Sequence, residues 1–221
     1  MRRYTRPANT SSAVRAQRKE RGQTLDDFPT PPWATRALME HVLKLTDAKQ
    51  QVCWEPACGR GHMARTLDEY FDAVIATDIK DYSGETTYPV TFNFVNGNAS
   101  EILYNLGNPA WIITNPPFNQ AEAFVHKAYA LATVGVAIFA RLGFLESIGR
   151  YNRLFKPIPP TIIAPFTERP LLLEGRLSRT GSTATAYMWA VWIKSKPHAR
   201  KTQVVWIPPC RQDLERDTDY D

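Results

Sequence analysis

The sequence predicts an α/β protein built on one doubly wound sheet. Short apolar segments alternate along the chain with segments whose apolar residues recur at helical spacing. Residues 134–140 form a near-continuous apolar run, as expected for a strand that is buried on both faces. A length of 221 residues allows one sizeable core, and no internal repeat interrupts the alternation. The pattern therefore favours a single domain with helices on both faces of its sheet.

The first helix is expected to follow the segment 28–33 and to end at about Leu45. Thr30 is a plausible N-cap, proline follows in the first turn, and Leu38 and Val42 fall on the same face as Leu45. The other expected elements are helices at about 62–71 and 120–132, and strands at 52–54, 73–79, 91–95, 111–114, 134–140, 161–164 and 186–193, with 204–207 as one more candidate.

Basic charge is concentrated at the N-terminal end. The chain has a net charge of +5, with 27 basic and 22 acidic residues. Residues 1–24 are basic, polar and without apolar periodicity, so we expect a flexible arm. Such an arm suits the phosphate backbone of a nucleic acid, and equally a solvated tail without a partner. Residues 25–208 are expected to form the domain, and the acidic tail 209–221 to lie outside the fold.

The remaining composition favours a cytoplasmic protein. No apolar run approaches the ~20 residues needed to span a bilayer, and the N-terminus lacks the apolar core of a signal peptide. Cys53, Cys58 and Cys210 have no metal-ligand spacing, and their odd number argues against a disulfide framework. We therefore expect a reducing compartment, no membrane partner and no metal.

Two motifs are expected at the carboxyl ends of strands, where open α/β sheets bind ligands. Gly59 and Gly61 follow the first strand, and they allow a tight turn and close approach of the backbone to a ligand. Asp78 ends the next strand, 19 residues after Gly59, where a carboxylate can accept hydrogen bonds from a ribose. The glycine turn alone also fits the dinucleotide fingerprint G-x-G-x-x-A, so it does not identify the cofactor.

A third motif, Asn115-Pro116-Pro117-Phe118, follows the apolar run 111–113. The two prolines stiffen the backbone at the end of this strand. The carboxamide oxygen of Asn115 and the carbonyl of Pro116 can both accept hydrogen bonds from one exocyclic amine, while Phe118 stacks on the ring that carries it. A proline turn that closes a strand would explain the two prolines, but not the flanking Asn and Phe.

Asn-Pro-Pro-Phe resembles the catalytic motif of amino-methyltransferases, in particular of DNA adenine-N6 methyltransferases. Glu55-Pro56 before the glycines resembles the [DE]-P-x-x-G-x-G motif of DNA methyltransferases that use S-adenosylmethionine. The order of the motifs is similar to that in small phage and prophage adenine methyltransferases, over roughly residues 25–195. The resemblance implies a Rossmann-like methyltransferase fold, with a mostly parallel seven-stranded sheet and an antiparallel late strand. It also implies S-adenosylmethionine as cofactor, DNA as partner and a bacterial or phage-infected cell.

The resemblance further implies roles for individual residues. Glu55 is expected near the methionine end of the cofactor and Asp78 near its ribose. Asn98 stands where the family often has an aspartate near the adenine, which is a departure from the family pattern. The catalytic set is Asn115, Pro116, Pro117 and Phe118. The cofactor-binding set is Phe28, Thr30, Pro31, Trp33, Glu55, Pro56, Ala57, Cys58, Gly59, Gly61, Asp78, Asn98 and Asn115.

The implied reaction is in-line methyl transfer to a base flipped out of the DNA stack. His62 is expected in a loop or at the start of a helix rather than as a catalyst. The basic segments 141–156 and 174–183 are candidate DNA contacts, and an ordinary surface hairpin loop is an equal alternative for the second. No restriction partner is evident.

Several alternatives stay open. Cytosine-N4 methylation uses the same geometry, but serine or aspartate more often stands in place of Asn115. Methylation of RNA or of a protein glutamine amide usually goes with Asn-Pro-Pro-Tyr. A non-catalytic DNA-binding module would have a broken cofactor motif, and a nicotinamide oxidoreductase would have no need of Asn-Pro-Pro-Phe.

Overall fold

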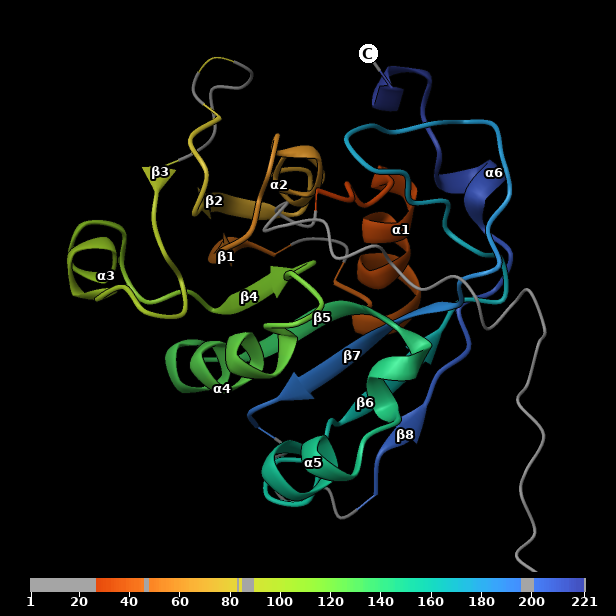
Figure 1. Ribbon diagram of the computed structural model, residues 1–221. Coiled ribbons are helices and arrows are strands. Elements are labelled where there is room, and N and C mark those ends of the chain that lie inside the picture. Colours follow the sequence, from red (N-terminus) through yellow and green to blue (C-terminus); the bar gives the residue numbers. More distant parts are fainter. Residues whose placement is uncertain (1–26, 46–47, 83, 85–89, 196–200, 221) are drawn as a thin grey trace, which may run out of the picture.

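The chain forms one mixed sheet with helices packed on both of its faces (Figure 1). The computed structural model describes residues 27–45, 48–82, 84, 90–195 and 201–220. The predicted arm 1–24 therefore lies outside the described residues. The strands are β1 (Ala48–Glu55), β2 (Phe71–Asp78), β3 (Val90–Thr91), β4 (Trp111–Thr114), β5 (Gly135–Arg141), β6 (Ile162–Pro165), β7 (Tyr187–Ile193) and β8 (Gln203–Val204).

The strand order is β3-β2-β1-β4-β5-β7-β6-β8. Strands β1 to β5 pair in parallel, whereas β7 runs antiparallel to both β5 and β6. This confirms the prediction of a mostly parallel α/β sheet with an antiparallel late strand. The described part contains eight strands rather than seven, because the candidate at 204–207 pairs with β6 through the two residues of β8.

The two faces of the sheet are covered by different helices. The helices are α1 (Pro32–Ala37), η1 (Leu38–Leu43), α2 (His62–Leu67), α3 (Ser100–Leu106), α4 (Ala121–Leu131), η2 (Leu142–Leu145), α5 (Ile148–Arg150), η3 (Tyr151–Phe155), α6 (Arg211–Leu214) and η4 (Asp217–Tyr220). α1 and α2 pack on one face, and α3, α4 and η3 on the other. Neighbouring residues of a strand serve opposite faces, as Ile113 and Ile112 do.

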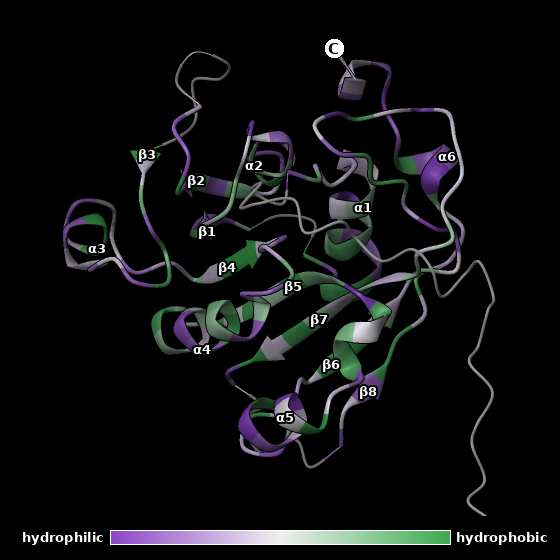
Figure 2. Cartoon of the chain, in the orientation of Figure 1, coloured by the Kyte–Doolittle hydropathy of each residue, from purple (hydrophilic) through white to green (hydrophobic). Residues whose placement is uncertain are grey.

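The central strands are buried on both sides, as their composition requires. Figure 2 shows β4, β5 and β7 in the green of hydrophobic residues. Trp189 and Trp192 of β7 are fully buried on opposite faces. This agrees with the continuous apolar run predicted for β5, which lies between β4 and β7.

Several element boundaries differ from the prediction. The first helix begins at Pro32, with Pro31 and not Thr30 at its N-cap position. The second helix ends at Leu67 instead of residue 71, because Phe71 already pairs with Ala48 in the sheet. The third strand stops at Thr91 rather than 95, and the helix α3 was not predicted at all.

The C-terminal segment packs on the domain, contrary to the expectation that residues 209–221 lie outside it. Arg36 of α1 donates hydrogen bonds to both carboxylate oxygens of Asp219, at 2.7 and 2.8 Å, and to the carbonyl of Leu214. The side chains of Arg36 and Asp219 are each only 4% exposed. Cys210 is also buried. An acidic segment can therefore be part of a fold when a buried arginine neutralises it.

Candidate functional site

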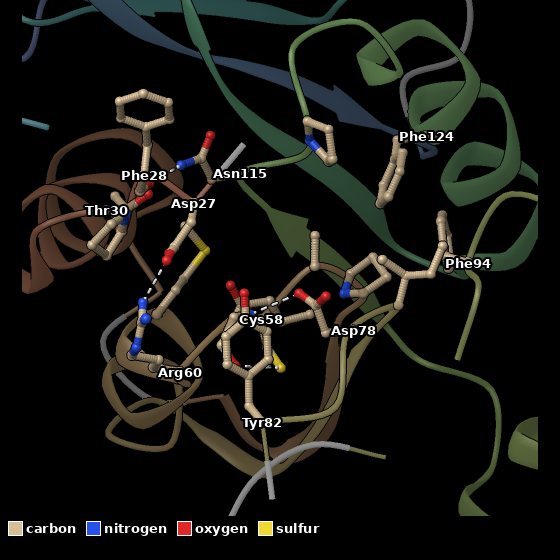
Figure 3. A pocket seen from close by; sticks show the side chains of 18 of the residues that line it. Asp27, Phe28, Thr30, Cys58, Arg60, Asp78, Tyr82, Phe94, Asn115 and Phe124 are labelled. Atoms are coloured by element: carbon tan, nitrogen blue, oxygen red, sulfur yellow. Dashed lines mark hydrogen bonds and ion pairs between the residues drawn. The ribbon is translucent and has the colours of Figure 1, made fainter. Parts of the chain in front are cut away.

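A cavity of about 590 Å³ opens at the carboxyl ends of β1, β2 and β4 (Figure 3). Its walls come from the segment before α1, from the turn after β1, from the end of β2, and from the turns after β3 and β4. The strand order reverses beside β1, which is flanked by β2 and β4. This is the place where open α/β sheets bind ligands.

The turn after β1 is folded against the end of β2. Gly59 and Gly61 have φ values of 52° and 80°, which side chains other than glycine rarely adopt. The N–H of Gly59 donates to Asp78 Oδ2 at 2.9 Å, and the N–H of Cys58 donates to the carbonyl of Thr77 at 3.0 Å. The turn leads directly into α2, so its backbone approaches the cavity closely.

Asp78 connects the two loops that border this part of the cavity. Its Oδ2 accepts the bond from Gly59, and its Oδ1 accepts one from the N–H of Lys80 at 3.0 Å. Burial raises the pKa of this carboxyl, while the same backbone N–H groups oppose the rise. The carboxylate is thus fixed in position at the wall of the cavity.

Glu55 ends β1 and is only 2% exposed. Burial raises the pKa of its carboxyl well above the usual range, and the nearby charge of Asp78 adds to this. The N–H of Ala64 bonds to the carboxyl, whereas Oε2 is buried without a hydrogen-bond partner among the described residues. Thr30 Oγ1, also at the cavity wall, is buried without a partner in the same part of the chain. Buried polar atoms are usually paired, so a ligand with polar groups would suit this end.

Asn115 follows β4 and lines the cavity beside Phe28. Its Nδ2 donates to the carbonyl of Phe28 at 2.9 Å (Figure 3). This bond uses the donor end of the carboxamide and orients Oδ1 as the acceptor. The next residue, Pro116, is buried, so the backbone of the motif is held by the fold.

Phe118 is half-buried beside the cavity rather than in its wall. Its ring centroid lies 6.1 Å from that of Phe28, with the planes tilted by 41°. The guanidinium carbon of Arg141, at the end of β5, lies 4.1 Å from the same centroid. A planar cation at this distance makes a cation–π contact.

The structure brings most of the predicted site residues together. Those at the cavity wall are Phe28, Thr30, Glu55, Pro56, Ala57, Cys58, Gly59, Asp78, Asn115 and Pro117. Trp33 instead lies in the core, 1% exposed and edge-on to Phe166 at 5.6 Å. Pro31 and Gly61 are the N-cap residues of α1 and α2 and do not line the cavity.

Asn98 is also outside the cavity wall. It is exposed, and its Oδ1 accepts hydrogen bonds from the N–H and the hydroxyl of Ser100 at the start of α3. Asn93, which the sequence analysis missed, lines the cavity between Phe92 and Phe94. Lys127 of α4 holds this turn, because its Nζ donates to the carbonyl of Gly97 at 2.6 Å.

Four aromatic residues missed by the sequence analysis also line the cavity, namely Tyr82, Phe92, Phe94 and Phe124. The ring centroids of Phe94 and Phe124 lie 5.0 Å apart. A signal existed for Phe92 and Phe94, because an aromatic-Asn-aromatic sequence directly after a strand is unusual for a surface turn. The cavity therefore has an apolar end, which suits a flat ring, as well as a polar end.

Charged residues close the rim of the cavity. Asp27 forms an ion pair of 2.6 Å with Arg60, and Lys80 lies over the ring of Tyr82 at 4.3 Å. His62 starts α2, as predicted, and burial lowers its pKa to about 4, with help from Arg65 and Arg60. His62 is therefore neutral at physiological pH.

No group of His, Cys, Asp or Glu side chains among the described residues could hold a metal ion. No helix in that part of the chain is long and apolar enough to cross a membrane.

Comparison with known proteins places the fold. No protein-family model and no curated protein sequence matches the chain. Among solved structures, the methyltransferase subunit of a type I restriction-modification system from Streptococcus thermophilus has a TM-score of 0.59 at 10% identity, over 89% of this chain and 50% of that one. A protein from Listeria monocytogenes, provisionally named a class I S-adenosylmethionine-dependent methyltransferase, has a TM-score of 0.56 at 10% identity, over 85% of this chain and 68% of that one.

A third structure, provisionally named an RNA methyltransferase and from Pyrococcus horikoshii, has a TM-score of 0.51 at 13% identity, over 76% of this chain and 88% of that one. The chain spans half the length of the restriction-modification subunit. At these identities the likeness establishes the fold, which is the Rossmann-like fold of class I S-adenosylmethionine-dependent methyltransferases.

Proposed function

We propose that this protein transfers a methyl group from S-adenosylmethionine to the N6 amine of adenine in DNA. The observation that carries the proposal is the fixed carboxamide of Asn115. Its donor end is bound to the carbonyl of Phe28, so Oδ1 is the end that accepts a hydrogen bond at the edge of the cavity. An acceptor held in this way suits a substrate amine.

The cavity fits the cofactor in size and in chemistry. Its volume of about 590 Å³ lies within the range of cavities that bind small organic ligands. Oε2 of Glu55 has no hydrogen-bond partner in the described chain and suits an ammonium group, and Thr30 Oγ1 can donate to a carboxylate. Asp78 suits ribose hydroxyls, and Phe94 and Phe124 suit an adenine ring. When bound, the cofactor supplies an electrophilic methyl group on a sulfonium.

The chain's own residues then act by position rather than by titration. The lone pair of an adenine amine is conjugated with the ring, so it is a poor nucleophile. Hydrogen bonds from this amine to Asn115 Oδ1 and to the carbonyl of Pro116 would direct its lone pair toward the methyl group. His62 is neutral and lines the cavity at the start of α2, and this mechanism needs no proton transfer through it.

Phe118 and Arg141 favour a planar substrate. The base would approach beside the ring of Phe118, where stacking supports bases in other nucleic-acid-binding proteins by about 1–3 kcal/mol. Segment 141–156 carries Arg141, Arg150, Arg153 and Lys156, which suit the phosphates around the target base. The basic arm 1–24 remains a proposed phosphate contact.

The test is transfer of a tritiated methyl group from S-adenosylmethionine to DNA and to RNA, followed by nucleoside analysis. We expect N6-methyladenine in DNA with the wild-type protein. Asn115→Ala should abolish transfer and leave cofactor binding intact in a calorimetric titration. Asn105→Ala, an exposed position on α3, is the matched control and should behave like the wild type.

Other products would change the proposal in defined ways. N4-methylcytosine or labelled RNA would retain the fold and cofactor but replace the substrate. A protein that binds the cofactor and labels no nucleic acid would favour a protein glutamine amide as substrate. Full transfer by Asn115→Ala would contradict the mechanism.

A further inference from the structure

An exposed apolar tip lies on the segment that follows β5. Ile148, the first residue of α5, is 85% exposed, which makes it the most exposed aliphatic side chain in the described chain. Tyr151 is 57% exposed and Leu142 is 39% exposed, so three large apolar side chains within ten residues point to solvent. Single exposed apolar residues are common, but three of them on one short segment favour an interaction site.

The tip is held rigidly by its own segment. Ser147 Oγ accepts a hydrogen bond from the N–H of Arg150 at 3.2 Å and thereby caps α5. The guanidinium of Arg150 bonds to the carbonyl of Phe144 and lies 4.3 Å from the centre of its ring. Phe144 is buried against Phe155, with ring centroids 5.7 Å apart. Ile148 is therefore presented on a fixed support.

Gly149 adds to this support. A Cβ at this position would lie 2.9 Å from Nη1 of Arg153, so the arginine side chain passes directly over the glycine. Arg153 continues to Glu122 at the start of α4, with hydrogen bonds of 2.6 and 2.8 Å. The N-terminal end of α4 comes directly after the Asn-Pro-Pro-Phe motif, so the support of Ile148 is tied to the catalytic loop.

A second connection reaches the same loop. Arg141, at the start of the segment, lies over the ring of Phe118 at 4.1 Å. The segment therefore contacts the catalytic motif at Phe118 and contacts α4 four residues later, at Glu122. Its net charge is positive, since residues 141–156 contain four basic side chains and one acidic one, Glu146. A positive surface with a rigid apolar tip matches duplex DNA, whose phosphates are anionic and whose base stack is apolar.

We propose that Ile148 is a wedge that enters the base stack of duplex DNA when the target base leaves it. The inference rests on the proposed function and narrows its substrate to the double-stranded form. An adenine amine in a duplex is inside the stack, so the base must be turned out at a cost in stacking and pairing. An apolar side chain that fills the vacated step recovers part of this cost, and architectural proteins insert isoleucine in the same way.

The experiment compares two duplexes in the sequence context that mapping of the methylated positions in treated plasmid DNA identifies. In one the target adenine is paired with thymine, and in the other it lies opposite an abasic site. Ile148→Ala should lower methyl transfer to the paired duplex by about tenfold, because the burial of one isoleucine is lost. The loss should largely disappear on the abasic duplex, where the base is already unpaired. Ile148→Leu should retain transfer to both.

Val204→Ala is the matched control, since it shortens an exposed aliphatic side chain on the edge strand β8. It should leave both rates unchanged, and thermal unfolding of all variants should match the wild type. Equal losses on the two duplexes, or no loss on either, would overturn the wedge. Absence of methyl transfer by the wild type to any DNA would instead overturn the proposed function.

Discussion

The two basic segments that the sequence nominates as DNA contacts have opposite surroundings. Segment 141–156 contacts the Asn-Pro-Pro-Phe loop, whereas segment 174–183 contacts the acidic C-terminal segment. Arg141 of the first lies over Phe118. Arg179 of the second donates to Asp217 Oδ1 at 3.1 Å and lies over the ring of Tyr220 at 4.9 Å. Similar compositions therefore lead to different electrostatic roles.

Arg141 retains donor capacity beside the site. Its Nε is buried without a hydrogen-bond partner in the described chain, and its guanidinium stacks on an aromatic ring. A buried donor without a partner is costly, so a nearby acceptor from a ligand would be favourable. The position suits contact with a nucleotide.

Arg179 is already neutralised by its neighbours. Glu215 Oε1 lies 4.0 Å from it, in addition to Asp217. Segment 174–183 also contacts the rim of the cavity, because the N–H of Gly175 donates to the carbonyl of Asp27 at 2.8 Å. Segment 174–183 thus connects the C-terminal segment to the rim. A basic loop therefore contributes to phosphate binding only where acidic neighbours do not already engage its charge.

The largest expected effect concerns the anchor of the C-terminal segment. Arg36→Met would remove the cation from Asp219, which is 4% exposed, while Glu69, which is 23% exposed, would keep its ion pair with Arg216 at 2.8 Å. Loss of one partner of a buried ion pair is strongly destabilising, and partial exposure of Glu69 places this case at about 3 kcal/mol. Urea unfolding should show a lower midpoint.

Arg65→Met is the control, because Arg65 is an exposed arginine on α2. Its midpoint should stay close to that of the wild type. Equal midpoints for Arg36→Met and Arg65→Met would contradict the view that the C-terminal segment is part of the fold. Equal midpoints would also mean that the C-terminal segment is not fixed in place to hold Arg179, which is what distinguishes segment 174–183 from segment 141–156.

The second effect compares the two segments directly. Arg141→Met should lower methyl transfer about tenfold, because a partly buried cation–π contact beside Phe118 is lost. Arg179→Met should lower it by no more than about twofold, since an exposed arginine engaged by acidic groups contributes little. Rates at saturating cofactor would measure both, and calorimetry should find cofactor binding unchanged. Equal losses would show that the second segment contacts the substrate as closely as the first.

Much of the fold could be predicted because its strands are short apolar runs with clear ends. β4 has the predicted bounds, since the prolines after Thr114 stop it. The helix α3 was missed although a signal for it exists, since Ile102, Leu103 and Leu106 recur at helical spacing before Gly107. The place of the C-terminal segment, in contrast, could not be predicted. It depends on the bond between Arg36 and Asp219, which are 183 residues apart.

The site residues also divide into those that the sequence predicts and those that depend on contacts between distant parts of the chain. The pairing of the glycine turn with Asp78 could be predicted from spacing, and the bond from Gly59 to Asp78 realises it. The choice between Asn93 and Asn98 could not be made, because both lie in one turn after a short strand. Lys127 of α4 fixes that turn through Gly97, which is 30 residues away along the chain. Contacts of this range carry no local signal.

The smallest expected effect tests whether the acidic segment restrains the second basic loop. Asp217→Asn removes one of the two carboxylates near Arg179, and Asp213→Asn makes the same change of charge elsewhere on the segment. Because the pair is exposed, we expect DNA affinity at low salt to rise only about twofold in Asp217→Asn beyond the change in Asp213→Asn. Fluorescence anisotropy with a labelled duplex, at two salt concentrations, would measure this difference. An equal rise in both variants would mean that overall charge alone is responsible, so that the acidic segment restrains Arg179 no more than the surroundings of Arg141 restrain that arginine.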